Sequence, residues 1–163
     1  MKHEAGLSPT VEADKLLVEI GFSSPIHASA MHIPIRGVIQ AGGPVESFEH
    51  EDEDDTIVVA NHLLSGKHEA LFALRVRGDS MIDALVQEGD VVLLQKTAEV
   101  RNGDMVAAWL KLKQETTLKY YYRAGNKIQL KPANPAYDPI EVPAQNVVIQ
   151  GKVVLVQRQP AAL

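Results

Sequence analysis

Short apolar runs separated by turn residues dominate the sequence from residue 56 onward. The runs at 90–94 and 104–110 are almost continuously apolar, which is typical of strands buried on both faces. Gly-containing turn signals follow at intervals, such as Asn102-Gly103-Asp104 and the hairpin signal Ala124-Gly125-Asn126. The predicted strands are 32–39, 56–59, 70–76, 90–94, 104–110, 115–123, 127–130 and 147–157. This pattern, with almost no helix, predicts an all-β fold of barrel or sandwich type.

The first 31 residues have a different character. Ser8-Pro9 is a helix-start signal, and a weak apolar stripe then runs to Gly21, so we expect one short helix inside an N-terminal arm. A three-helix DNA-binding unit needs about 11–12 residues per helix plus turns. The space before His32 is too short for it, and no DNA-binding domain is recognisable in residues 1–31.

Residues 32–56 form a second distinct region. The run 32–39 alternates as a strand does, and Pro34 within it favours an edge strand. Small residues follow at Ala41, Gly42 and Gly43. A run of seven carboxylates then extends from Glu46 to Asp55, and such a run stays solvated. It lacks the alternating ligands and central glycine of a calcium loop, so no metal site is expected.

Composition limits the class of protein further. The chain has 163 residues, 45% of them hydrophobic and 23% charged, which fits one globular domain with an appended arm. It has no apolar run of about 20 residues and no signal-peptide pattern, so a cytoplasmic protein without membrane contact is expected. Zero cysteines exclude disulfides, thiol nucleophiles and cysteine-based zinc sites. The net charge of −5 gives no general attraction for nucleic acid.

Ser80 is the candidate nucleophile. It lies between the strand-like run 70–76 and a short apolar stretch, in Arg77-Gly78-Asp79-Ser80-Met81, where a sharp turn would expose its hydroxyl. A plain turn has the same pattern. A seryl hydroxyl needs a base. The six histidines lie in the arm, the acidic region or polar turns, although a spatial Ser-His pair stays possible.

Lys119 is the other candidate base. It lies mid-strand, and a period of two places it on one face with Thr117 and Tyr121. Burial disfavours the ammonium form and lowers a lysine pKa. The pKa would have to fall about three units from ~10.4 for the amine to act as a base near pH 7. A lysine on a solvent-facing strand surface is the commoner arrangement.

Several ordered blocks of this sequence resemble the C-terminal domain of LexA-type repressors, the self-cleaving regulators of the bacterial SOS response. The resemblance runs from Val76 to Arg158, and residues 35–42 resemble the family's cleavage-site strand with its Ala-Gly pair. The matching blocks are 76–82, 88–90, 100–104, 117–119, 132–135 with 139–140, and 148–154. With the cleavage-site strand included, these ordered blocks are spread over about four-fifths of the chain.

The resemblance implies a role for each site residue. Ser80 would be the nucleophile and Lys119 the neutral general base of a Ser-Lys peptidase that needs no cofactor. The backbone N–H groups of Asp79 and Ser80 would hold the oxyanion, and the cut would fall between Ala41 and Gly42 of the same chain. The domain division that follows is 1–31 arm, 32–56 cleavage-site strand, loop and acidic linker, and 57–163 catalytic and dimerisation domain.

The resemblance also implies partners. Family members dimerise through the final strand, which here is 147–157, and a RecA–single-stranded DNA filament stabilises the inserted form of a cleavage loop that otherwise rests mostly away from the site. They bind DNA through an N-terminal winged helix-turn-helix, of which residues 1–31 show no sign. A UmuD-like subunit of a translesion polymerase, with the same catalytic domain behind a short arm, is therefore an alternative. A non-catalytic dimerisation module and a trans-acting signal-peptidase-like enzyme are two others.

Overall fold

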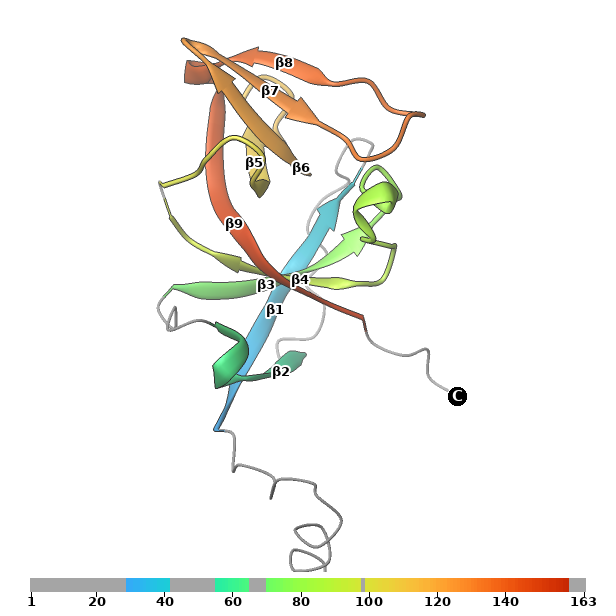
Figure 1. Ribbon diagram of the computed structural model, residues 1–163, viewed down its shortest axis with the longest axis vertical. Helices are drawn as coiled ribbons and strands as arrows, with labels where there is room; N and C mark the ends of the chain where they lie inside the picture. The colour runs from blue at the N-terminus through green and yellow to red at the C-terminus, as the bar shows by residue number, and fades with distance from the viewer. Residues whose placement is uncertain (1–28, 42–54, 65–69, 98, 159–163) are drawn as a thin grey trace, which may run out of the picture.

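A computed structural model describes residues 29–41, 55–64, 70–97 and 99–158. Nine strands form one sheet in the order β2-β1-β3-β4-β9-β5-β6-β7-β8 (Figure 1). The fold is mainly β, as the sequence predicts. The strands are β1 (Ala30–Gln40), β2 (Thr56–Ala60), β3 (Leu71–Arg77), β4 (Val91–Gln95), β5 (Met105–Leu110), β6 (Glu115–Ala124), β7 (Lys127–Lys131), β8 (Ile140–Pro143) and β9 (Val147–Gln157).

Strand β1 is not at the edge of the sheet, and the interpretation of Pro34 as an edge residue is wrong. The first half of β1 pairs antiparallel with β2, and the second half pairs parallel with β3 and, at Gln40, with β6. Pro34 is the last residue of the β2 ladder, opposite Thr56, and the β3 ladder begins at Ile35. The proline therefore lies where the strand exchanges one partner for another, so its missing N–H interrupts neither ladder.

The apolar runs are buried as their patterns predict. Val91, Val92, Leu93 and Leu94 of β4 are each fully buried, because β4 lies between β3 and β9 and is covered on both faces. Buried side chains form three clusters. The first cluster contains Ile39, Ala41, Leu118 and Met81, the residue that follows the candidate serine.

Strand β9 connects the two halves of the molecule. Figure 1 shows it running from the group β5–β8 to the group β3–β4. Residues 147–152 pair with β5 and residues 152–157 pair with β4, each antiparallel. At the crossing, Gly151 lies so close to its neighbours that an added Cβ would be 3.0 Å from Phe72 Cζ, so a larger residue would not fit without movement. In the described part of the chain, residues 153–157 have no strand partner on the side away from β4.

The structure also contains elements that the sequence pattern did not indicate. These are the short strand β8 and the 3-10 helices η1 (Asn61–Leu64) and η3 (Ala144–Asn146). A third 3-10 helix, η2 (Ile82–Ala84), lies in the short apolar stretch after Ser80. The expected arm helix and most of the acidic run lie outside the described residues.

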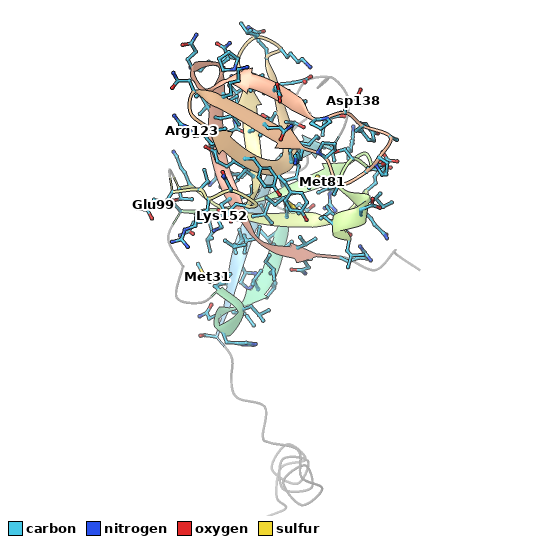
Figure 2. The ribbon with its side chains drawn as sticks, turned by 45° about the horizontal axis from the view of Figure 1, so that its top comes forward. Met31, Met81, Glu99, Arg123, Asp138 and Lys152 are labelled. Atoms are coloured by element: carbon cyan, nitrogen blue, oxygen red, sulfur yellow. The ribbon has the colours of Figure 1, made fainter. Side chains whose placement is uncertain are left out.

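Figure 2 shows Met81 beside η2, and Met31 near the N-terminal end of β1. Among the described residues, no helix is both long and apolar enough to cross a membrane.

Candidate functional site

Ser80 lies in the turn that follows β3. Gly78 has φ of +83°, a conformation that glycine adopts without strain, and it lets the chain reverse directly after the strand. Ser80 itself is fully buried. Its carbonyl oxygen accepts a hydrogen bond from Ala133 N–H at 2.7 Å, which ties the turn to the segment between β7 and β8. The hydroxyl thus lies inside the protein, on a turn that this hydrogen bond holds in place.

Lys119 brings its amine to this hydroxyl from β6. Nζ lies 2.8 Å from Ser80 Oγ, 2.8 Å from Thr117 Oγ1 and 3.0 Å from the carbonyl oxygen of Leu118. The side chain is only 2% exposed, so the solvent-facing alternative is wrong. The shared face of Lys119 and Thr117 follows from strand alternation, as predicted. Strand β6 is an inner strand of the sheet, paired with β5 on one side and β7 on the other.

The environment of Lys119 changes its acidity. Burial lowers its pKa from the usual 10.5 to about 8, and the negative charge of Glu115 partly opposes this fall. A neutral amine has two N–H donors and one lone pair. The donors can go to Leu118 O and Thr117 Oγ1, which leaves the lone pair for the Ser80 hydroxyl proton. The three contacts therefore suit an amine that accepts a proton from serine.

Ala41 completes the group. It is fully buried at the end of β1, and its N–H donates to the Arg77 carbonyl oxygen at 2.6 Å. Its carbonyl oxygen accepts a hydrogen bond from Ser80 N–H at 3.0 Å. The adjacent strand pairs, Gln40 with Arg77 and with Thr117, fix the approach of β1. A carbonyl polarised by a backbone N–H thus lies beside a serine that contacts an amine. Ala41 is thus docked at Ser80; Gly42 lies outside the described residues.

The segment between β7 and β8 supplies residues to which the sequence analysis gave no role. Asn134 Nδ2 donates to the Asp79 carbonyl oxygen at 2.9 Å, and the Tyr137 hydroxyl donates to Asp79 Oδ1 at 2.5 Å. The hydrogen bond with Asp79 raises the pKa of Tyr137. The block 132–135 was noticed only as part of the resemblance, and sequence separation of more than 50 residues hides the contact. The role of the Asp79 N–H group stays a prediction.

The other candidate chemistries receive no support from the described residues. His32 and His62, the two histidines that the structure describes, are exposed, whereas Ser80 is buried. Within the described ranges, no group of three or more His, Asp or Glu side chains is arranged to hold a metal ion. The amine of Lys119 is thus the basic side chain that contacts Ser80.

Comparison with known protein families defines the class. Residues 34–154 match the family described as Peptidase S24-like. The matched segment covers most of the chain, which therefore belongs to this family of serine peptidases.

Within that class, the similar proteins are LexA repressors. The chain is 36% identical over 160 residues to the LexA repressor of Herpetosiphon aurantiacus, a match that covers 97% of this chain and 73% of that protein. It is 40% identical to the LexA repressor of a Roseiflexus species and 42% identical to LexA repressor 1 of Nocardia farcinica, each match covering 80% of this chain. The chain spans 62% and 56% of the length of these last two relatives.

Proposed function

We propose that the chain cleaves its own peptide bond between Ala41 and Gly42, with Ser80 as nucleophile and Lys119 as general base. One observation carries the proposal. The Ala41 carbonyl oxygen accepts the Ser80 N–H, while Ser80 Oγ contacts the buried Lys119 amine at 2.8 Å. Substrate carbonyl, nucleophile and base are therefore grouped within one chain, which removes the entropic cost of bringing them together.

The chemistry is acyl transfer through the serine. As Oγ attacks the Ala41 carbonyl carbon, the hydroxyl proton passes to the neutral Lys119 amine. The carbonyl oxygen takes up negative charge, which the Ser80 N–H stabilises, together with the Asp79 N–H in this proposal. The bond to the Gly42 nitrogen breaks, and the Lys119 ammonium returns the proton to that leaving amine. Water then hydrolyses the Ala41 ester: Lys119 takes a proton from the water and passes it to the departing Ser80 oxygen, and the new carboxylic acid of Ala41 loses its proton to solvent.

The test is cleavage of the purified chain at alkaline pH without any added partner. Fragments ending at Ala41 and beginning at Gly42 are expected by mass spectrometry, and both Ser80→Ala and Lys119→Met should abolish them. An equally fast cut in Ser80→Ala would refute the mechanism. The circular dichroism spectrum of each variant shows whether it is folded.

At the level of the cell, the proposed role is that of a LexA-like repressor inactivated in the SOS response. The similarity to LexA repressors over 80% or more of this chain supports it, and favours it over the UmuD-like alternative. A RecA–single-stranded DNA filament would accelerate the cut by stabilising the inserted strand, and operator DNA would be bound by an N-terminal domain. Adding the filament at neutral pH, and measuring the cleavage rate against filament-free protein, tests this role.

Dimerisation through β9 belongs to the same proposal. Residues 153–157 lack a strand partner on one side within the described sheet, and Val156 is 37% exposed. An open strand edge of this kind can pair with a second copy. Val156→Lys should therefore lower the dimer fraction in sedimentation experiments, whereas a charge at the exposed Leu112 should not.

A further inference from the structure

Strand β1 carries the cleavage point at its end, and it is also part of the core. Ile33, Ile35 and Ile39 of β1 are each at most 5% exposed, and they contribute to two of the three buried clusters. The strand is inserted between β2 and β3, with a further pair to β6. Pulling β1 out would expose apolar surface in both clusters, which is unfavourable in water.

Among the described residues, the hydrogen bonds that hold β1 join atoms on the N-terminal side of the bond to be cut to partners on its C-terminal side. Ala41 N–H is bonded to Arg77 O, and Ala41 O to Ser80 N–H. At the other end of the β3 ladder, Ile35 N–H donates to the Asp55 carbonyl oxygen at 2.9 Å. None of these hydrogen bonds needs the covalent link between Ala41 and Gly42.

We infer that β1 stays in the sheet after the cut, so that residues 1–41 and 42–163 persist as a noncovalent complex; this rests on the proposed function only for the position of the cut. Cutting the chain removes the high effective concentration that the connecting segment provides, but it removes no packing contact of β1. The surface that holds the strand accepts an extended peptide with apolar side chains at alternate positions and a small residue at its end.

Retention of β1 has a consequence for the site. The new carboxylate on Ala41 would lie at the Ser80 N–H, close to the Lys119 amine, where a negative and a positive charge favour one another. The product then occupies the place that another peptide would need. Each chain therefore cuts once, and separation of the two parts becomes a step distinct from cleavage.

The experiment makes the cut without using the protein's own chemistry. A recognition sequence for a sequence-specific protease is inserted between Gly43 and Pro44 in the full chain carrying Ser80→Ala, and the purified protein is then cut. We expect both pieces to co-elute in equal amounts on size exclusion and to separate only in denaturant. Elution of the larger piece alone, with the shorter piece in a later peak, overturns the inference.

A matched pair of variants tests whether the buried face of β1 is responsible. Ile35→Ala truncates a buried side chain, whereas Arg36→Ala alters an exposed one on the same strand. After the cut, Ile35→Ala should release the short piece at least about tenfold faster than Arg36→Ala, since truncating a buried Ile weakens packing by more than the free energy of a tenfold change. If Ile35→Ala does not fold, Ile33→Val replaces it as the variant with a truncated buried side chain. Equal release rates in the buried and exposed variants contradict the inference.

The result of this experiment can be separated from the result of the self-cleavage test. A chain that fails to cut itself at alkaline pH, yet holds its pieces together after the protease cut, refutes the self-cleavage and leaves the retention of β1 intact. A chain that cuts itself and at once loses residues 1–41 does the reverse.

Discussion

Lys119 Nζ and Ser80 Oγ lie 2.8 Å apart, although the two residues are 39 positions apart in the sequence. Strand β6 and the turn after β3 bring them together, and Thr117 Oγ1 and Leu118 O occupy the remaining positions around the amine. Because the amine is buried, its pKa falls to about 8. The contact between Lys119 and Ser80 and the lowered pKa of Lys119 together determine how the proposed cleavage should respond to pH and to substitution.

The cleavage rate should follow the deprotonation of Lys119. Below pH 8 the neutral fraction of an amine with a pKa of about 8 rises about tenfold for each pH unit, and it levels off above about pH 9. Rates of self-cleavage measured between pH 6 and pH 10 should show this rise and plateau. A rate independent of pH across that range would show that another group is the base.

Lys119 should cost the protein stability at neutral pH. Its folded pKa is lower than its unfolded value of 10.5, so between about pH 8 and 10.5 the unfolded chain binds more protons, and stability rises with pH through that window. Below pH 8 the full cost applies, about 3 kcal/mol at 1.36 kcal/mol per pKa unit.

Replacing the amine by an apolar side chain of similar length removes that cost. Lys119→Met should therefore be more stable than the parent at pH 7, by up to about 3 kcal/mol, and the advantage should shrink toward pH 10. Urea denaturation at both pH values measures the difference. A variant that is less stable at pH 7 would contradict the assigned cost of burying the amine.

Much of the fold follows from local pattern, because each strand carries its own signal. The predicted run 147–157 coincides with β9, and 115–123 differs from β6 by one residue, since alternation and flanking turns define such segments. The place of β1 in the sheet could not be predicted in this way. Its neighbours β2, β3 and β6 are distant in sequence, and Pro34 alone favoured the wrong position.

The residues of the site also divide into those that local sequence patterns indicate and those that they do not. Ser80 and Lys119 could be found because a Gly-containing turn and a mid-strand lysine are visible locally, and the resemblance joined them. Tyr137 could not be found. Its contact with Asp79 depends on how the segment after β7 folds back over the turn after β3, and no periodicity reports that arrangement.

Thr117 should orient the amine, and removing its hydroxyl should slow cleavage. Thr117→Val keeps the shape of the side chain and removes the 2.8 Å contact to Nζ, for which a loss of about tenfold in rate is expected from one hydrogen bond. Thr116→Val is the matched control. Thr116 is equally buried on the same strand, but its hydroxyl contacts Gln150. Equal rates for the two variants would remove Thr117 from the mechanism.

Tyr137 should act through the turn that it holds. Tyr137→Phe removes the hydrogen bond to Asp79 Oδ1, so the Ser80 backbone becomes less well fixed, and cleavage should slow severalfold. The midpoint of the pH profile should stay where Lys119 sets it. Tyr122→Phe, which keeps the ring that Lys131 contacts, is the control. A shifted midpoint would mean that Tyr137 changes the acidity of the amine instead.

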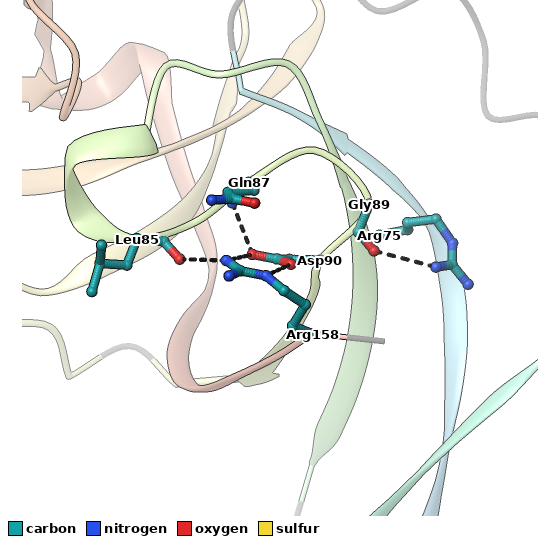
Figure 3. A network of polar contacts seen from close by, with 6 residues as sticks. All are labelled: Arg75, Leu85, Gln87, Gly89, Asp90 and Arg158. Carbon is teal, nitrogen blue, oxygen red and sulfur yellow. Dashed lines mark hydrogen bonds and ion pairs between the residues drawn. The ribbon is translucent and has the colours of Figure 1, made fainter. Parts of the chain in front are cut away.

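Arg158 should fasten the end of β9 to the loop before β4. Burial alone would raise the pKa of Asp90, but hydrogen bonds from Arg158 and from Gln87 N–H, with the Arg158 charge, hold it below its usual 3.8. Figure 3 shows the guanidinium contacting both Asp90 oxygens, at 2.9 and 3.1 Å, and the Leu85 carbonyl. Asp90 is 2% exposed, so without Arg158 its carboxylate would keep only the Gln87 N–H among these partners.

Arg158→Ala should therefore destabilise the protein at pH 7, by less than the loss of a partner from a fully enclosed pair, because the arginine is half exposed. The contribution of a carboxylate with a lowered pKa is present above its unfolded value and is lost as the pH falls through the folded one. The deficit of Arg158→Ala should thus narrow as the pH falls below about 3.8 and through the lower folded pKa of Asp90. Denaturation of both proteins at pH 7 and pH 3 measures this change, with Arg123→Ala as an exposed control. A deficit of the same size at both pH values would show that Arg158 stabilises β9 through packing and not through its charge.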